Sequence, residues 1–255
     1  MTSCLHRLAN PARVFACAAL LVASAALAAQ PAPAPRTAFP GAMGWAAHTP
    51  GGRGGKILRV TTLAGEGPGS LREAVEAKGP RIVVFEVGGV IDLGVKALKI
   101  REPFLTIAGQ TAPQPGITLV RGGIDLSAHD VVIQHLRVRP GEAGLPKMAG
   151  TDFDSISTVG AHDVIVDHCS LTWSTDENLS ASGTRFKGET PAQWRDGTSH
   201  RITFSNNILA EGLGFATHAK GEHSKGSLIH DNARDILVIG NLYSQNRERN
   251  PMFKG

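Results

Sequence analysis

Residues 163–171 (DVIVDHCSL) decide the fold, because their pattern of a polar residue, a β-branched run and a turn is repeated elsewhere in the chain. The same pattern recurs in residues 130–138 (DVVIQHLRV), 201–209 (RITFSNNIL) and 235–243 (DILVIGNLY). Steps of 33, 38 and 34 residues separate the second positions of the four segments, which are Val131, Val164, Ile202 and Ile236. A period of this size is typical of a solenoid, a propeller or another repeat array.

The parallel β-helix is the repeat architecture that fits these segments best. A propeller blade needs paired hairpins, which the sequence does not signal, and the β-branched content excludes helical repeats. Asn207 and Asn241 occupy the same place in consecutive repeats, where stacked amides would form an internal ladder. Two unrelated turn asparagines are the alternative. We therefore predict an all-β chain that folds as a parallel β-helix.

Two smaller features agree with this prediction. Glycine makes up 30 of 255 residues, about 12% against a typical ~7%, which indicates many tight turns between short strands. Helical periodicity is confined to residues 70–77 (SLREAVEA), where Leu71, Ala74 and Val75 share one face. We expect one short helix near the N-terminus.

The first residues are typical of an export signal. Residues 14–28 form an apolar run after Arg7 and Arg13, and the run ends in small residues. About fifteen apolar residues are too few to span a bilayer, which needs ~20, so we predict a signal peptide over residues 1–28 rather than a membrane anchor. A Pro/Ala linker over residues 29–38 follows. Secretion and no stable membrane insertion are the expected consequences.

Charge and cysteine content change once this segment is removed. The formal net charge falls from +4 to +2, so the mature protein lacks the basic stripe of a nucleic-acid binder. Cys4 and Cys17 also leave, and Cys169 remains as the only cysteine. No intrachain disulfide can form, and Cys169 is expected to be packed in the interior.

Paired carboxylates are the first candidate site. Asp152 and Asp154 are two residues apart, so in a strand their side chains would share a face. Asp176 and Glu177 follow about one coil later, where stacking could bring carboxylates of two coils together. Such a group suits calcium, which prefers several oxygen ligands. Paired carboxylates also serve in glycoside hydrolysis, and an exposed turn is the third interpretation.

Cationic residues gather in the C-terminal part of the chain, close to two histidines. They are Lys220, Lys225, Arg247, Arg249 and Lys254, with His218 and His223 beside them. Cations facing a carboxylate-bound metal suggest an anionic substrate held between them. Ordinary surface charge is the alternative.

Taken in order, the motifs resemble those of pectate lyases from the polysaccharide lyase family that folds as a right-handed parallel β-helix. The resemblance covers residues 39–255. It is carried by residues 51–55 (GGRGG), 60–75 (VTTLAGEGPGSLREAV), 80–93 (PRIVVFEVGGVIDL), 106–119 (TIAGQTAPQPGITL), 163–180 (DVIVDHCSLTWSTDENLS), 218–229 (HAKGEHSKGSLI) and 249–251 (RNP).

The resemblance implies a set of roles for the charged residues. Calcium would be held by Asp152, Asp154, Asp176 and Glu177. Arg249 would act as the Brønsted base and Lys225 would be the second catalytic residue, with Lys220 as the alternative lysine. His218, Lys220 and Lys254 would bind the substrate. Arginine is normally fixed as a cation, so the base role needs nearby positive charge or burial.

Three departures from the family pattern stand out. Ser180 replaces an aspartate that often completes the calcium site, and Lys254 replaces an arginine that binds the substrate carboxylate. The chain also stops at Gly255, earlier than the resemblance implies, so residues 39–255 are expected to form a lyase domain that is incomplete at its C-terminal end.

The expected activity is calcium-assisted β-elimination of α-1,4-linked polygalacturonate by a secreted monomer. Two alternatives stay open. A hydrolase of the polygalacturonase type would use the same scaffold, although the further aspartate pair and the Gly-His-Gly-like element it needs are not found. A β-helix that binds acidic polysaccharide without cleaving it is the other.

Overall fold

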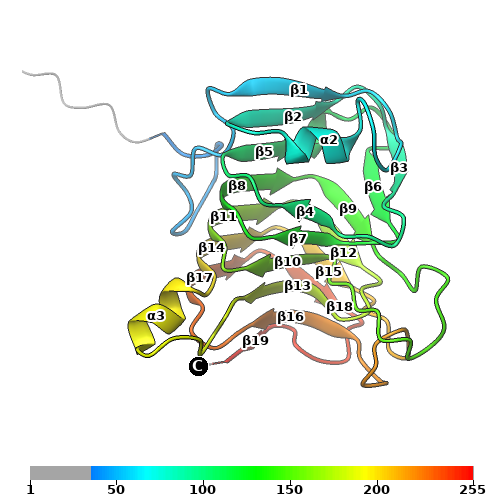
Figure 1. Cartoon of the computed structure of the whole chain (residues 1–255), viewed down its shortest axis with the longest axis vertical. Coiled ribbons are helices and arrows are strands. Elements are labelled where there is room, and N and C mark those ends of the chain that lie inside the picture. Colours follow the sequence, from blue (N-terminus) through cyan, green and yellow to red (C-terminus); the bar gives the residue numbers. More distant parts are fainter. Residues whose placement is uncertain (1–35, 255) are drawn as a thin grey trace, which may run out of the picture. The chain divides into compact units, whose positions relative to one another are not determined.

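Parallel strands recur in groups of three along residues 36–254, which are the residues that the computed structural model describes. From β2 onwards, each coil of the chain contributes one strand to each of three parallel sheets, here called A, B and C, and β1 adds a further strand to sheet A. The coils stack along the long axis of the molecule (Figure 1). The predicted signal peptide and residues 29–35 of the predicted linker lie outside the described residues.

The three sheets take their strands in chain order. Sheet A contains β1 (Lys56–Val60), β2 (Arg81–Phe85), β5 (Leu105–Ala108), β8 (His129–Gln134), β11 (His162–Asp167), β14 (His200–Ser205) and β17 (Arg234–Ile239). Sheet B contains β3 (Gly89–Asp92), β6 (Ile117–Val120), β9 (Leu136–Arg139), β12 (Ser170–Thr172), β15 (Ile208–Ala210) and β18 (Leu242–Ser244). Sheet C contains β4 (Leu98–Ile100), β7 (Ile124–Leu126), β10 (Ile156–Val159), β13 (Glu177–Ser182), β16 (Lys225–Ile229) and β19 (Met252–Phe253). This is the predicted parallel β-helix.

Sheet A confirms the register that the sequence period predicts. Val164 pairs with Val131 of the preceding coil and with Ile202 of the following coil, and Ile202 pairs with Ile236. Val131, Val164 and Ile202 are fully buried, so like side chains stack on like inside the solenoid. Burial of about 25 cal/mol per Å² of apolar surface is the main favourable term in such a core.

The predicted asparagine ladder is present at the turn between sheets A and B. Asn207 Nδ2 donates to Asn241 Oδ1 over 2.9 Å and also to the Val166 carbonyl over 3.0 Å. Cys169 occupies the equivalent place one coil earlier, and its backbone N–H donates to Asn207 Oδ1 over 2.8 Å. The ladder therefore pairs backbone groups that the turn would otherwise bury without partners.

Cys169 is buried as predicted, with 2% of its surface exposed. Burial raises the pKa of its thiol to about 12, so the group stays protonated and unreactive in the folded chain.

Helix α2 (Leu71–Glu76) confirms the predicted N-terminal helix. Ser70 caps it by accepting a hydrogen bond from the Glu73 backbone N–H, and the buried face is the predicted one. A second helix, α3 (Pro191–Asp196), and the 3-10 turn η2 (Gly109–Thr111) were not predicted. Helix α3 has no buried residue, so hydrophobic periodicity could not reveal it. Its capping box between Thr190 and Gln193 was the available signal.

Arg81 holds helix α2 against the first coils. Its guanidinium is 1% exposed and donates to five backbone carbonyls, which belong to Ala74, Val75, Gly79, Glu102 and Pro103. Burial lowers the pKa of Arg81, and the nearby Glu102 carboxylate opposes that shift. Hydrogen bonds to carbonyls at the end of the helix replace the water that this cation loses.

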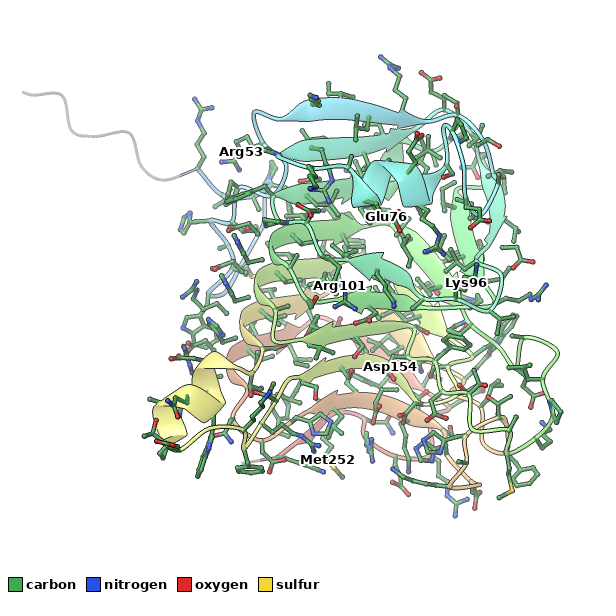
Figure 2. All side chains as sticks on the ribbon, in the orientation of Figure 1. Arg53, Glu76, Lys96, Arg101, Asp154 and Met252 are labelled. Carbon is green, nitrogen blue, oxygen red and sulfur yellow. The ribbon has the colours of Figure 1, made fainter. Side chains whose placement is uncertain are left out.

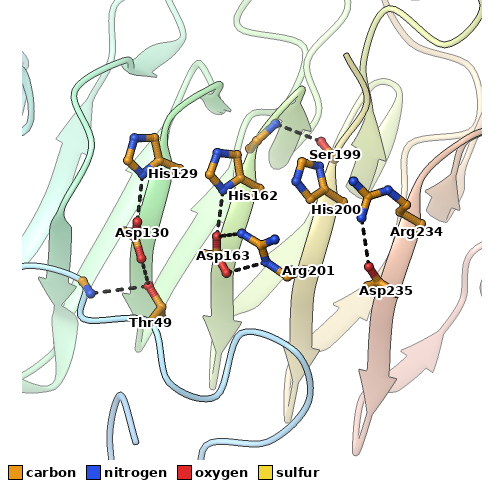
Figure 3. A network of polar contacts seen from close by, with 12 residues as sticks. Thr49, His129, Asp130, His162, Asp163, Ser199, His200, Arg201, Arg234 and Asp235 are labelled. Atoms are coloured by element: carbon orange, nitrogen blue, oxygen red, sulfur yellow. Dashed lines mark hydrogen bonds and ion pairs between the residues drawn. The ribbon is translucent and has the colours of Figure 1, made fainter. Parts of the chain in front are cut away.

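Figure 3 shows a second ladder, at the start of the sheet A strands. The imidazole rings of His129, His162 and His200 stack, with centroids 4.8 and 4.9 Å apart. Asp163, next to His162, accepts hydrogen bonds from the His162 ring over 2.7 Å and from Arg201 Nε over 2.8 Å. In-register coils thus align side chains of one kind into rows on the outer surface as well as inside.

Among the described residues, no helix is long and apolar enough to span a membrane.

Replacement of Asn207 by Ala should destabilise the fold strongly. The Cys169 N–H and the Val166 carbonyl would lose their partners inside the turn, and each buried group left unpaired costs about 1–3 kcal/mol. We expect the free energy of unfolding to fall by about 3 kcal/mol in guanidinium titrations. The exposed control Gln110→Ala should change it by less than about 0.5 kcal/mol. Equal effects of the two variants would contradict the ladder.

Candidate functional site

The candidate residues gather at one corner of the β-helix, where the chain passes from sheet B to sheet C. Four successive connections form this corner: residues 140–155, 173–176, 211–224 and 245–251. They contain most of the predicted site residues, while Glu177 and Lys225 are the first residues of the strands that follow. Lys254 lies just beyond β19. Parallel stacking therefore brings residues about one hundred positions apart to a single corner.

Asp152 and Asp154 reach the site from the end of the first connection. They precede β10 rather than forming part of it, and both line the same groove. Ser155 and Ile156 are both fully buried, so the alternation of faces breaks between Asp154 and Ile156. In a regular strand, Asp154 and Ile156 would point to the same face. The chain therefore bends between them, so that Asp154 lines the groove while Ile156 is buried.

Three carboxylates from two coils meet in the groove. Oxygen atoms of Asp154, Asp176 and Glu177 lie within 4.8 Å of one another. Asp154 Oδ1 accepts the Glu177 backbone N–H over 3.0 Å, and Asp154 Oδ2 accepts the Ser180 hydroxyl over 2.5 Å. Burial and the neighbouring Asp176 charge raise the pKa of Asp154 to about 7, although the hydrogen bonds from Ser180 and Ser157 oppose the shift. The cluster thus concentrates negative charge that a cation would neutralise.

Asp152 lies at the edge of this cluster. Its Oδ2 is 3.6 Å from His218 Nε2, and its side chain is 41% exposed. Asp176 contacts two histidines in the same way, with His223 Nε2 at 3.0 Å and His218 Nε2 at 3.7 Å. Of the four predicted acidic residues, Asp154, Asp176 and Glu177 therefore form a cluster, and Asp152 lies at its edge.

Two adjoining cavities form the groove on sheet C. The first has a volume of about 440 Å³ and is lined by all four predicted metal ligands and by Asp125, Ser157, Ser180 and other residues of β7, β10 and β13. The second, of about 260 Å³, is lined by Asp176, Glu177, Arg185, Lys220, His223, Leu228, His230, Arg249 and Lys254. Figure 2 labels Asp154 on this face of the molecule. One cavity is mainly acidic and the other mainly basic, and they share Asp176, Glu177 and His230.

Arg249 lines the second cavity and contacts Glu177, which lines both. Its guanidinium forms an ion pair with the carboxylate of Glu177, which is 5% exposed. Arg249 Nε is buried and has no hydrogen-bond partner among the described residues. The residue also has φ of 60°, a left-handed conformation that non-glycine residues adopt at a cost. Arg249 is thus held in a strained position with one N–H group still available.

The three predicted lysines have different surroundings. Lys220 and Lys254 line the basic cavity. Lys225 does not line either cavity, because its side chain is 8% exposed and its Nζ pairs with Glu248 Oε2 over 2.5 Å. The geometry therefore favours Lys220 over Lys225 as the lysine that meets a ligand, contrary to the sequence-based order.

His218 also differs from its predicted place. It is 3% exposed, and its ring stacks on that of His223 behind the carboxylates instead of lining the groove. Its Nδ1 accepts the Lys220 backbone N–H over 3.1 Å, so the neutral ring carries its proton on Nε2. This nitrogen faces Asp152 and Asp176, so His218 contacts the acidic residues and lines neither cavity.

Sequence reasoning did not assign Arg185, His230 or Ser157 to the site. Arg185 and His230 follow the ends of β13 and β16, outside the motifs. Burial and the Arg185 and Lys254 charges lower the pKa of His230. Ser157 faces outward and pairs with Ser180 Oγ over 3.0 Å. The period of the repeat was the only signal for them, because strand ends of successive coils lie side by side.

The donor set fits calcium. Asp154, Asp176 and Glu177 supply only oxygen ligands, which calcium prefers, and their oxygen atoms lie within 4.8 Å of one another. Ser180 hydrogen-bonds to Asp154, so it orients one carboxylate instead of adding another.

Comparison with known proteins gives sequence relatives of one kind. The chain is 39% identical over 219 residues to a protein named probable pectate lyase C from Aspergillus terreus, and the match covers 86% of this chain and 45% of the relative. It is 30% identical over 224 residues to pectate lyase 5 from Ambrosia artemisiifolia, covering 80% of this chain and 50% of that protein. The chain thus spans about half the length of these curated relatives. No protein-family profile matches it.

Among solved structures, the chain resembles Jun a 1, the major allergen from cedar pollen. The TM-score is 0.50 at 21% sequence identity, and the match covers 78% of this chain and 62% of the other. The predicted resemblance to pectate lyases and the predicted parallel β-helix are therefore both confirmed.

Replacement of Gly226 by Ala should disturb Arg249. A Cβ atom at Gly226 would lie 2.3 Å from the Arg249 carbonyl oxygen, so the Arg249 backbone must move. We expect a loss of about 1–3 kcal/mol in the free energy of unfolding. The matched control is Gly214→Ala, where a Cβ meets no atom within 4 Å, and it should be neutral. Equal stability of the two variants would show that the close approach is not a constraint.

Proposed function

We propose that this chain carries the active site of an exported pectate lyase, which cleaves polygalacturonate by calcium-assisted β-elimination. Export would depend on residues 1–28, and we expect the protein to act as a monomer. The observation that carries the proposal is that an acidic cluster and a set of cations line adjoining cavities, and that Arg249 of the basic cavity pairs with Glu177, which both cavities share. The resemblance to proteins named pectate lyases supports the choice of substrate.

Asp154, Asp176 and Glu177 would hold the calcium ion, with Asp152 at the edge of the site. Bound there, calcium would neutralise the carboxylate of a galacturonate unit and make the proton on the adjacent C5 atom more acidic. Lys220 and Lys254, on the other side of Asp176 and Glu177, would bind and orient neighbouring carboxylates of the polymer.

Arg249 would remove the C5 proton, and the C5–H electron pair would form the C4–C5 double bond. The C4 glycosidic oxygen would leave with the C4–O electron pair and take up a proton from water. Glu177 belongs both to the acidic cluster and to the ion pair with Arg249. If Glu177 held a cation, its ion pair with Arg249 would be weaker, and the Arg249 guanidinium would be available to the substrate. The lysines that line the same cavity disfavour a further positive charge there, which helps an arginine to act as a base.

Polygalacturonate cleavage tests the proposal. The chain, incubated with polygalacturonate and calcium at alkaline pH, should give a product with the ultraviolet absorbance of a 4,5-unsaturated uronide, and EDTA should abolish it. Arg249→Ala should lower the rate by at least about 100-fold, the usual contribution of a general base. Binding of oligogalacturonide should persist in that variant.

Two results would reject elimination for a demonstrably folded sample. New reducing ends without ultraviolet absorbance would indicate a hydrolase. Binding of oligogalacturonide without any product, in wild type as in Arg249→Ala, would indicate a polysaccharide-binding β-helix. Gln110→Ala serves as the activity control, because Gln110 lies outside the groove and is exposed.

Substitutions of Lys220 and Lys225 should have different effects, the first on substrate binding and the second on stability. Lys220→Ala should raise KM for polygalacturonate several-fold and leave the melting temperature unchanged, because Lys220 is exposed at the cavity. Lys225→Ala should lower the melting temperature, because a buried side chain and its ion pair with Glu248 are lost. Steady-state kinetics and thermal unfolding of both variants check this. A larger KM effect for Lys225→Ala at unchanged stability would reverse the assignment.

A further inference from the structure

We propose that Asp176, His218 and His223 form a second cation site, which takes a borderline divalent ion such as Zn²⁺ and adjoins the acidic cluster. One ligand atom from each of the three residues lies within 4.8 Å of the others. Two imidazoles and a carboxylate are a donor set that zinc prefers, whereas calcium prefers oxygen alone. The proposal concerns metal binding and does not depend on the elimination reaction.

Burial and ring geometry prepare the two histidines for one ion. His218 is 3% exposed and His223 is 7% exposed, so both rings are fixed by packing. Their centroids are 3.6 Å apart and their planes differ by 16°. Both Nε2 atoms point to the Asp176 carboxylate, at 3.7 Å from Oδ2 for His218 and 3.0 Å from Oδ1 for His223.

His223 is the stronger ligand because of the partner of its other nitrogen. Its Nδ1 lies 3.2 Å from the backbone carbonyl of Glu222, which can only accept, so Nδ1 carries the proton. Nε2 then presents a lone pair to Asp176, and two acceptors at 3.0 Å require a proton or a metal ion between them. A ring N–H donated to a carbonyl is the usual support of a metal-binding histidine.

His218 is the weaker ligand for the converse reason. Its Nδ1 accepts the Lys220 N–H, so the Nε2 that faces Asp176 carries the proton. Binding a metal through this Nε2 requires the proton to move to Nδ1 and the hydrogen bond from Lys220 to break. We therefore expect removal of His223 to weaken the site more than removal of His218.

The two cation sites share Asp176, which also belongs to the cluster with Asp154 and Glu177. An ion held by the histidines withdraws negative charge from that cluster and repels a second cation close to it. Zinc should therefore weaken calcium binding, and calcium should weaken zinc binding by the same factor.

Direct metal titration tests the proposal. The full chain, freed of metal by a chelator, is titrated with Zn²⁺ by calorimetry and with Co²⁺ by visible absorption, which reports nitrogen ligation. We expect His223→Ala to lose one equivalent of Zn²⁺ or to bind it at least about tenfold more weakly. His218→Ala should lose less. The matched control His230→Ala, a groove histidine outside the cluster, should titrate like wild type.

Unchanged Zn²⁺ titration and an unchanged Co²⁺ spectrum in His223→Ala would overturn the proposal. Such unchanged titrations are expected if zinc binds instead to the row of His129, His162 and His200, which the substitution does not alter. Circular dichroism confirms folding of each variant, and His223→Gln, which keeps most of the side-chain volume, provides a second test. Zn²⁺ should then weaken the calcium affinity of wild type but not that of His223→Ala.

Discussion

In-register stacking of parallel strands is the constraint on which the rest of the structure depends. Strands of adjacent coils lie about 4.8 Å apart, so each residue lies beside its counterpart one coil away. Val131, Val164 and Ile202 become neighbours inside, and His129, His162 and His200 become neighbours outside. The same rule brings Asp154 and Glu177 together at the corner between sheets B and C, where the candidate site lies. Core, ladders and site are thus three results of one geometry.

Stacking like on like is favourable for apolar side chains and costly for charged ones. Asp154 illustrates the cost, because burial and then the neighbouring Asp176 charge raise the pKa of its carboxyl to about 7. In the rows of outward-facing side chains outside the groove, acidic residues lie beside basic ones, as Asp163 lies beside Arg201. In the groove, Asp154, Asp176 and Glu177 lie close together, and of these three only Glu177 has an arginine partner. This difference in charge pairing distinguishes the candidate site from the rest of the surface.

Much of the fold could be predicted from the sequence, because the residues that stack between coils recur at a nearly regular spacing along the chain. Val131, Val164, Ile202 and Ile236 gave the register, and Asn207 and Asn241 gave the ladder. Helix α3 was missed because it buries nothing, and the burial of Arg81 was missed because its five carbonyl partners come from helix α2, Gly79 and the adjacent pair Glu102 and Pro103. For the site, residue types and order were sufficient for the acidic cluster. The side-chain directions of Lys225 and His218 depend on Glu248 and His223, and no spacing rule gives them.

The corner between sheets B and C has an evolutionary consequence. Its connections differ in length, from residues 173–176 to residues 140–155, while the strands on either side keep their register. Loop closure becomes only slowly more costly as loops lengthen. Insertions and substitutions at this corner can therefore accumulate without disturbing the stacked interior. A scaffold of this kind lets ligand preference diverge between lineages while the architecture is inherited unchanged.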